Sequence, residues 1–428
     1  MQFEYLDVKQ LFGLYDYRID FFKENHLTII TGPNGYGKTT LLTILDSLSA
    51  QSLYYFYLLK FDRIEAGFND GSCIIINQIY VKENLEDNVQ GSDIQQEIVK
   101  EVRFRWLDKE EKEICQFVYN NNIINKAKRN IRYESNYRMR NSSSSSRELD
   151  RVLLKEKKFN ELVARETGQD LFLMQLQGLQ TKFIHANRIY RETDETSGDL
   201  PIQRIKKELQ QQISEAYKNY LLQSQRIDNL FIKNVLSKEK NVVSEENYNT
   251  LVAEVTEAQD NLFRFKLTDK IDIPKYDKEN SFILSNYVQG LKNKYSQYGN
   301  LTEKLNLFNK LLLSKKFANK DILFSPKHGF QIVSANGDLL DESLLSSGEQ
   351  NEIVLLFMLI FEVPDNSVLL IDEPENSLHV AWQKNFLSDV REIANIKNLQ
   401  VVVSTHSISI VTDGINNTHD LYYIHKKI

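Results

Sequence analysis

LSSGEQNEIVLLFMLIFEVPDNSVLLIDEPENSLH, residues 345–379, is the stretch that decides the fold class. Its residues 368–371, Val-Leu-Leu-Ile, form a short apolar run of the kind found in a parallel strand covered on both faces. Asp372 and Glu373 follow at the carboxyl end of that strand, where ligands of open α/β sheets bind. Taken alone, this pattern also fits a core strand followed by a solvated acidic turn. A second motif is therefore needed to distinguish a ligand site from such a turn.

Two adjacent carboxylates at a strand end can divide the work of nucleotide hydrolysis. We expect Asp372 to hold Mg²⁺ directly or through water, and Glu373 to orient and deprotonate the attacking water. Upstream, Ser346, Ser347 and Gly348 are expected to open a helix whose free N–H groups form an anion site.

The second motif lies near the other end of the chain. Residues 32–39 read Gly-Pro-Asn-Gly-Tyr-Gly-Lys-Thr, with a strand-like run before them and a helical run after them, as a P-loop requires. We expect Lys38 to reach the β- and γ-phosphates and the Thr39 hydroxyl to join the Mg²⁺ shell. The residues predicted to bind the nucleotide are Gly32, Pro33, Asn34, Gly35, Gly37, Lys38, Thr39 and Thr40.

A third strand end carries polar groups. An apolar run at 399–403 is followed by Ser404, Thr405, His406 and Ser407. A lone histidine is more often structural than functional, but this position beside two hydroxyl residues favours a site role for His406.

Composition limits the partners and the location of the protein. A formal charge of −6 over 428 residues gives no global basic field, so any contact with nucleic acid must be local. Cys73 and Cys115 match no metal or redox spacing. The N-terminus lacks a signal-peptide pattern, and the longest apolar run, 353–361, is shorter than the roughly 20 residues that span a bilayer. We expect a cytoplasmic protein without a membrane segment.

Hydrophobic patterns predict an α/β fold with three parts. Residues 1–140 should hold the P-loop and an antiparallel β lobe with strands at 73–81, 97–108 and 113–120. Residues 141–320 should form a helical insertion, a short coiled coil or bundle, with helical pieces at 149–180, 203–236, 245–266 and 280–316. Residues 321–428 should complete the first part and end with a strand at 420–424.

A basic segment runs from Lys126 to Arg140 and reads KAKRNIRYESNYRMR. Cations with interleaved aromatic residues can follow a phosphate backbone and stack on bases, so this segment is the candidate contact with DNA or RNA. The alternative, which we favour, is a solvated basic face with buried tyrosines.

With the P-loop, the Ser-Ser-Gly turn, the Asp-Glu pair and His406 in this order, the chain resembles ABC-class ATPases. Nearer by appearance are the SMC and RecF ATPases, and the ABC-like ATPases, usually labelled AAA, of bacterial anti-phage systems such as the OLD nucleases and the Septu ATPase subunit. The resemblance lies in residues 1–44 and 321–423. It implies an ABC-type ATPase head split by the helical insertion, with ATP and Mg²⁺ as cofactors.

The resemblance also implies a shared active site. Ser346, Ser347, Gly348 and Glu349 would be the signature sequence, with Ser346 and Gly348 on the γ-phosphate of ATP held by a second subunit. The protein would then work as a head-to-tail homodimer or a higher oligomer. His406 would be the switch histidine, acting with Glu373 in catalysis, and residues 375–379 would form the turn that faces the dimer partner.

The chain departs from the family at three places. Ser347 stands where glycine is usual, Tyr36 replaces a small P-loop residue, and no glutamine marks the expected Q-loop. The long separation of the P-loop and signature argues against transporters. OLD nucleases carry a metal-binding nuclease domain after the ATPase, and this sequence has no further acidic cluster, so the resemblance to defence ATPases implies a separate effector such as a nuclease. We therefore expect a sensor ATPase of anti-phage defence. The alternatives are a RecF-like or SMC-like DNA maintenance ATPase, and a slow ATP-gated scaffold.

Overall fold

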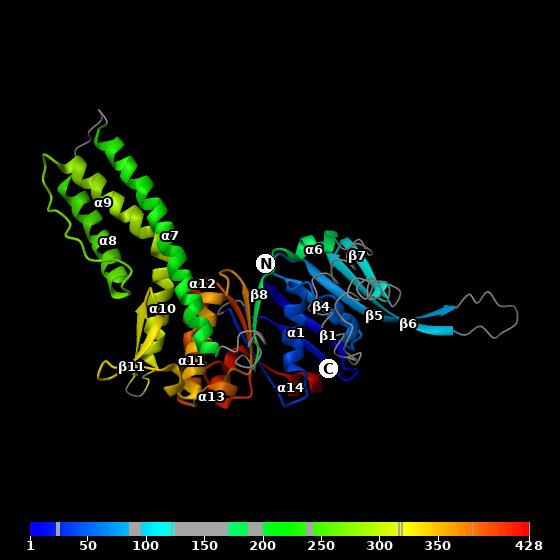
Figure 1. Ribbon diagram of the computed structural model, residues 1–428. Helices are drawn as coiled ribbons and strands as arrows, with labels where there is room; N and C mark the ends of the chain where they lie inside the picture. The colour runs from blue at the N-terminus through cyan, green and yellow to red at the C-terminus, as the bar shows by residue number, and fades with distance from the viewer. Residues whose placement is uncertain are drawn as a thin grey trace, which may run out of the picture. The chain divides into compact units, whose positions relative to one another are not determined.

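The computed structural model describes residues 1–22, 26–84, 96–120, 123–124, 170–186, 200–236, 243–315, 317, 320–378 and 380–427 (Figure 1). These residues form two compact units. The first unit comprises Met1–Ala186 with Val363–Ile428, and the second comprises Asn187–Glu362. The three parts expected from the sequence are residues 1–140, 141–320 and 321–428. They were defined by motifs and hydrophobic patterns, and this division of the chain remains a prediction.

A parallel five-stranded sheet is the centre of the first unit. Its strand order is β14-β3-β13-β12-β8, and every neighbouring pair is parallel. All residues of β12 and β13 are buried, as their apolar sequences require. The strands are β3 Leu27–Thr31, β8 Thr181–Ile184, β12 Val368–Asp372, β13 Gln400–Ser404 and β14 Thr418–Asp420.

The register of this sheet brings three strand ends to one edge. Asp372 pairs with Ser404 across β12 and β13, and Ser404 pairs with Ile30 across β13 and β3. Helix α1 packs on β8, β12 and β13, and α12 packs on α13. The helices of this unit are α1 Lys38–Ser49, α2 Tyr54–Leu58, α6 Asp170–Leu176, α12 Val380–Lys397, α13 Ile408–Thr412 and α14 Leu421–Lys427.

An antiparallel six-stranded sheet, in the order β2-β1-β4-β5-β6-β7, completes the first unit (Figure 1). Its inner face carries stacked aromatic pairs, with ring centroids 4.5 Å apart for Phe104 and Phe117 and 5.3 Å apart for Phe68 and Trp106. These rings share one core with Leu41 of α1. The strands are β1 Phe3–Leu11, β2 Tyr15–Asp20, β4 Arg63–Phe68, β5 Cys73–Asn84, β6 Gln96–Leu107 and β7 Glu113–Asn120.

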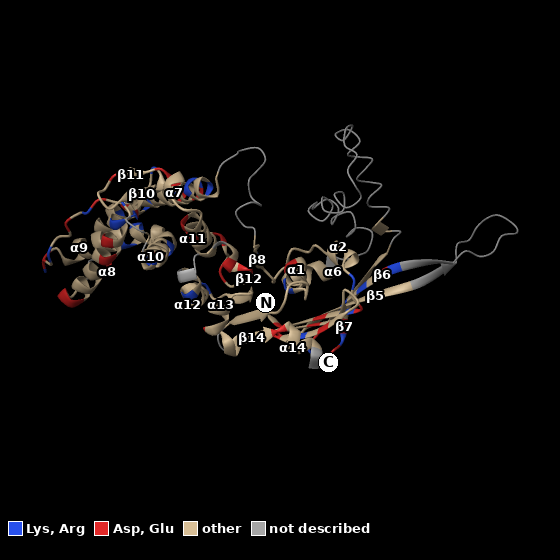
Figure 2. Cartoon of the chain, turned by 90° about the horizontal axis from the view of Figure 1, so that it is seen from below, with Lys and Arg blue, Asp and Glu red and all other residues tan. Residues whose placement is uncertain are grey.

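The second unit is mainly helical. Helix α7 has 35 residues, a length of about 50 Å, and both α7 and α8 pack on α9 (Figure 1). Basic and acidic residues are interspersed along these helices (Figure 2). The elements are α7 Pro201–Val235, α8 Glu245–Arg264, α9 Ser281–Tyr295, α10 Gly299–Ser314, β9 Lys320–Ser325, β10 Gly329–Ser334, β11 Leu339–Leu340, α11 Ser347–Phe357 and a π-helical turn Met358–Glu362.

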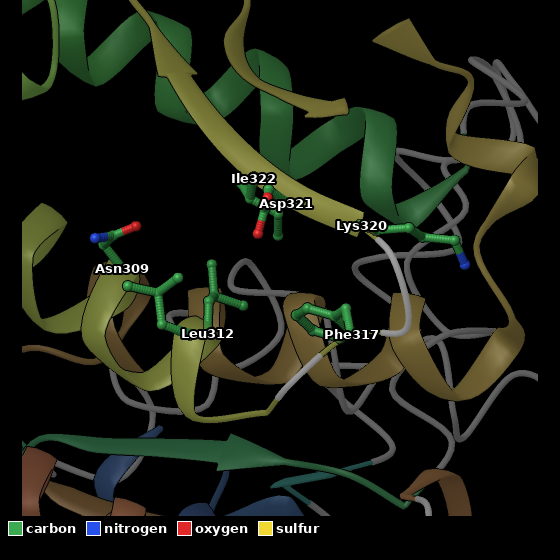
Figure 3. A pocket seen from close by; sticks show the side chains of 7 residues that line it. Asn309, Leu312, Phe317, Lys320, Asp321 and Ile322 are labelled. Carbon is green, nitrogen blue, oxygen red and sulfur yellow. The ribbon is translucent and has the colours of Figure 1, made fainter. Parts of the chain in front are cut away.

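A small cavity lies between the end of α10 and β9 (Figure 3). Its volume of about 60 Å³ has room only for a few water molecules. Leu312, Phe317 and Ile322 line it, and the Lys320 side chain leads away to Glu349. We regard this cavity as a packing feature of the second unit.

The predicted mixed α/β class, with a parallel sheet, an antiparallel lobe and a helical region, is confirmed. No helix in the described part of the chain is both long and apolar enough to cross a bilayer. The pattern at 149–180 falls mostly outside the described residues, and only α6 lies within them.

Two predicted elements are wrong in detail. The helical piece 280–316 is two helices, α9 and α10, separated by a 3-10 turn at Ser296–Tyr298. The predicted last strand, 420–424, is wrong because β14 ends at Asp420 and α14 follows at once. The Asp420 carboxylate accepts a hydrogen bond from the Tyr422 N–H at 2.9 Å and so stabilises the helix start. Strand β4 was not predicted.

Candidate nucleotide site

The P-loop joins β3 to α1, and its glycines have backbone conformations that other residues avoid. The φ angles of Gly32, Gly35 and Gly37 are 146°, 87° and 87°. At Gly37 a Cβ atom would also lie 3.0 Å from the Leu11 side chain. Helix α1 begins directly after Gly37 without an acidic residue in its first turn, so its free N–H groups form a positive end. This loop is therefore suited to a phosphate.

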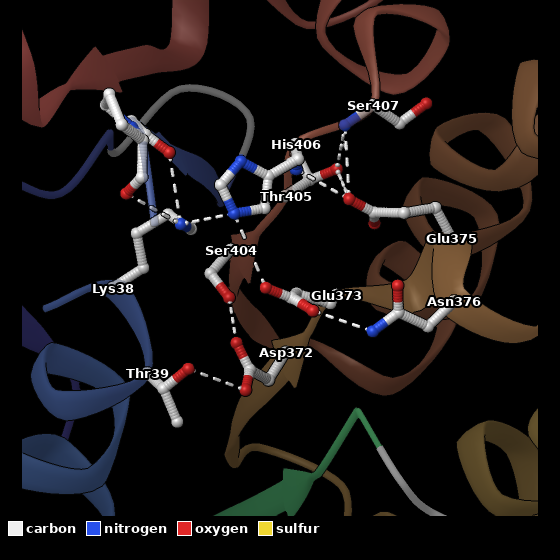
Figure 4. A network of polar contacts seen from close by, with 12 residues as sticks. Lys38, Thr39, Asp372, Glu373, Glu375, Asn376, Ser404, Thr405, His406 and Ser407 are labelled. Carbon is white, nitrogen blue, oxygen red and sulfur yellow. Dashed lines mark hydrogen bonds and ion pairs between the residues drawn. The ribbon is translucent and has the colours of Figure 1, made fainter. Parts of the chain in front are cut away.

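Lys38 lies at the centre of the site and is only 5% exposed. Its Nζ atom donates to the carbonyl oxygens of Gly32 at 3.0 Å and Pro33 at 3.3 Å, and lies 2.5 Å from His406 Nε2 (Figure 4). Burial lowers the pKa of Lys38, and the nearby carboxylates, first that of Glu373, act in the opposite direction. Because its direct partners are uncharged, this ammonium is well placed to bind an anion.

Asp372 is buried at the end of β12 and accepts two hydroxyl hydrogen bonds. Thr39 Oγ1 donates to Oδ2 at 2.9 Å, and Ser404 Oγ donates to Oδ1 (Figure 4). Burial raises the pKa of Asp372, while the bonds from Ser404 and Thr39 act to lower it. Carboxylate and hydroxyl oxygens are hard ligands, so Asp372 and Thr39 fit Mg²⁺. When bound, such an ion offsets the charge of phosphate oxygens.

Mg²⁺ at a phosphate site needs few protein ligands because phosphates and water supply the others. Among the residues that the structure describes, no group of three or more His, Cys, Asp or Glu side chains could hold a metal by itself. The pair formed by Thr39 and Asp372 therefore suits an ion that arrives with a nucleotide.

Glu373 has a left-handed backbone, with φ 44° and ψ 60°. That conformation costs about 1–2 kcal/mol for a residue with a side chain, and such strain often occurs at functional sites. The Glu373 N–H donates to the Ser404 carbonyl at 2.9 Å, and Asn376 Nδ2 donates to Glu373 Oε2 at 2.6 Å. The other carboxylate oxygen lies 3.5 Å from His406 Nε2 (Figure 4).

One ring nitrogen of His406, Nε2, lies close to both Lys38 and Glu373. A lysine ammonium can only donate, so Nε2 accepts from Lys38 and the ring proton of a neutral His406 lies on Nδ1. In that tautomer the contact of Nε2 with Glu373 is not a charged pair. The imidazole therefore separates the ammonium of Lys38 from the carboxylate of Glu373.

The structure brings most of the predicted site residues together within the first unit. Gly32, Pro33, Lys38, Thr39, Asp372, Glu373 and His406 gather where β3, β12 and β13 end (Figure 4). Asn34 and Gly35 are exposed in the loop, and Thr40 lies in the first turn of α1. His379 and the segment from Lys126 to Arg140 lie outside the described residues.

The four signature candidates belong to the second unit. Ser346 caps α11, which begins at Ser347 and continues through Gly348. The Ser346 Oγ accepts from the Glu349 N–H at 3.2 Å, and the Glu349 carboxylate accepts from the Ser346 N–H at 2.7 Å. Lys320 Nζ lies 2.9 and 3.1 Å from the two oxygens of the same carboxylate. The Glu349 carboxylate is therefore bonded to two other residues of the second unit.

Tyr36 and Glu375 have roles that sequence patterns did not assign. The Tyr36 ring stacks on Tyr15 with centroids 5.2 Å apart, and the Tyr36 carbonyl accepts from the Tyr17 hydroxyl at 2.8 Å. The antiparallel lobe thereby accommodates the large P-loop residue. Glu375 binds the loop that carries His406. In the sequence, only its position two residues after Glu373 indicated that Glu375 lies near the site.

Comparisons with known proteins give one family match and several solved structures with low similarity. Residues 7–411 match the family model described as the AAA ATPase domain. No curated protein matches the chain. The solved structures with similarity include the Smc head domain with an extended coiled coil bound to the C-terminal domain of ScpA, from Pyrococcus furiosus. It has 14% identity over 96% of this chain and 91% of that chain, with a TM-score of 0.39.

The SMC head domain from Thermotoga maritima has 12% identity over 98% of this chain and 94% of that chain, with a TM-score of 0.29. Such low scores add nothing to the family match. Since that match extends over most of the chain, the protein belongs to the AAA ATPase domain family.

Proposed function

We propose that this protein binds ATP with Mg²⁺ and hydrolyses it to ADP and phosphate. The observation that carries the proposal is the convergence of Lys38, Thr39, Asp372, Glu373 and His406 at adjacent strand ends. Lys38 and the P-loop N–H groups would bind the phosphates, and Thr39 and Asp372 would hold the ion. Glu373 would orient and deprotonate water, with His406 beside the γ-phosphate.

Glu373 distinguishes hydrolysis from the alternative of a slow ATP-gated scaffold. A pure switch needs a nucleotide site but no general base. The strained backbone of Glu373 and the bond from Asn376 hold its carboxylate in one orientation, which supports a catalytic role. Measuring phosphate release in the presence of Mg²⁺ tests this choice directly.

We further propose that two copies share each ATP, with Ser346, Ser347, Gly348 and Glu349 as the signature of the opposite copy. The support is the start of α11, where the N–H groups of Ser347 and Gly348 lie at the positive end of the helix. Glu349 would repel a phosphate, but its pairing with Lys320 offsets that charge. This arrangement would require a homodimer, or a larger assembly built from dimers.

The Ser346→Arg variant is expected to bind ATP normally as a monomer and to fail to form an ATP-dependent dimer. Arginine would remove the helix cap and introduce bulk and charge into the shared site. Light scattering with Mg-ATP measures the mass, in a Glu373→Gln background that retains ATP. The control Asn249→Arg adds the same side chain to an exposed position of α8. Normal dimers of Ser346→Arg would refute the shared contact.

For the biological role, we propose the cytoplasmic sensor ATPase of an anti-phage defence system that controls a separate effector nuclease. The support is the order of motifs shared with such ATPases, together with a nucleotide site that has residues for both binding ATP and hydrolysing it. The basic segment from Lys126 to Arg140 is the candidate contact with DNA or RNA.

Co-purification from a native host should recover an effector protein with the ATP-trapped Glu373→Gln variant, and less of it with Lys38→Ala, which is expected to bind ATP much more weakly. Mass spectrometry identifies the recovered protein. Hydrolysis strongly stimulated by DNA, with no partner recovered in any nucleotide state, would instead favour the DNA maintenance ATPase.

A further inference from the structure

The carboxylate of Glu375 binds three consecutive residues of the neighbouring loop. Its Oε1 atom accepts from Thr405 Oγ1 at 2.8 Å, from the His406 N–H at 2.5 Å and from the Ser407 N–H at 3.1 Å (Figure 4). Glu375 itself lies in the 3-10 turn Pro374–Ser377, directly after the strained Glu373. One side chain thus joins the turn after β12 to the loop after β13.

Two further contacts hold the same loops together. The Ser404 hydroxyl donates to Asp372 at the strand ends. The Ser407 hydroxyl donates to Gln383 Oε1 at 2.8 Å, and Gln383 Nε2 donates to the Leu378 carbonyl at 3.1 Å. The backbone of His406 is therefore fixed between bonded neighbours on each side, and Glu375 supplies the bond to His406 itself.

From this geometry we infer that Glu375 is the positioning residue for His406. By holding the backbone N–H groups of His406 and Ser407, it sets where the imidazole Nε2 lies between Lys38 and Glu373. The inference rests on the proposed hydrolysis of ATP at this site, and it adds a residue to which that proposal gave no role.

The chemistry of the contact requires a carboxylate. A single oxygen that accepts three hydrogen bonds is best served by a full negative charge, because charge-assisted bonds are stronger than neutral ones. Oε2 of Glu375 is buried and has no hydrogen-bond partner among the described residues. A glutamine could keep one acceptor oxygen, but its NH₂ group would then be buried at this unpartnered position.

The variant Glu375→Gln should lower kcat about tenfold and leave KM for ATP within about twofold, because Lys38 and Thr39 bind the nucleotide without it. In a His406→Ala background, the same change should have no further effect on kcat. An equal loss of kcat in both backgrounds would overturn the inference, because Glu375 would then act independently of His406. Glu110→Gln, at an exposed turn between β6 and β7, is the matched control.

A second measurement does not depend on hydrolysis. In ¹⁵N-histidine NMR spectra, the ring signals of His406, assigned by their absence in His406→Ala, should show one tautomer with the proton on Nδ1. In Glu375→Gln these signals should shift and broaden as the ring samples several positions. Unchanged ring signals would overturn the positioning role. A wild-type protein without ATPase activity would overturn the proposed function and leave this readout intact.

Discussion

The Glu373→Gln variant is expected to hydrolyse ATP about 10²- to 10⁴-fold more slowly than the wild type, which is the usual contribution of a general base. Glutamine keeps the shape of the side chain, and its amide oxygen can still accept the hydrogen bond from Asn376. It cannot accept a proton from water. ATP affinity should stay near the wild-type value, because the contacts of Lys38 and Thr39 are untouched.

Phosphate release gives the rate, and light scattering gives the solution mass with and without Mg-ATP. A monomer that becomes a dimer only with ATP would support the shared site. A constitutive dimer would point to the helices of the second unit as the assembly interface. The control Glu303→Gln changes an exposed carboxylate on α10. A Glu373→Gln rate within about threefold of wild type would exclude Glu373 as the base.

The sequence was most informative where a local pattern determines the structure. The apolar runs of β3, β12 and β13 and the polar residues at their ends predicted the parallel sheet and the polar edge where these strands end. Strand β4 was missed because Gly67 weakens its strand pattern. A Cβ at that position would lie 2.2 Å from the Tyr5 ring, so close packing between strands selects the glycine.

Tertiary burial explains the difference between the predicted strand at 420–424 and helix α14. The run 420–424 was predicted to be a strand, but only Asp420 pairs with β3, at Thr31. Leu421 is instead fully buried at the start of α14, where its Cβ would lie 3.2 Å from a Cβ at Gly32. Tertiary burial of one leucine therefore outweighs the local preference for a strand.

In the site, side-chain partners could not be predicted from the motifs. The P-loop pattern assigns Lys38 to phosphates, but the 2.5 Å contact with His406 depends on a residue 368 positions away. The bonds of Glu375 likewise depend on the register that sets β12 beside β13. A pattern of residue types can identify the strand ends, whereas the hydrogen bonds between them require the folded sheet.

The Lys38→Ala variant is expected to bind ATP at least about 100-fold more weakly than the wild type, a loss of about 3 kcal/mol, since truncating one partner of a buried charge pair costs that much. Isothermal titration calorimetry measures the affinity, and Lys112→Ala, at an exposed turn residue, is the control. Unchanged affinity in Lys38→Ala would refute the P-loop assignment.

A stability measurement separates lost binding from lost folding. Burial lowers the folded-state pKa of Lys38, so the charged side chain disfavours folding at neutral pH. This free-energy penalty falls as pH rises through the folded-state pKa, and it is gone above the unfolded-state pKa of about 10.4. Removing the side chain relieves that penalty and offsets the loss of its bonds to Gly32 and Pro33. Without nucleotide, the variant should therefore melt close to the wild type. The increase in melting temperature that Mg-ATP gives the wild type should be absent, since only bound ligand stabilises the folded state.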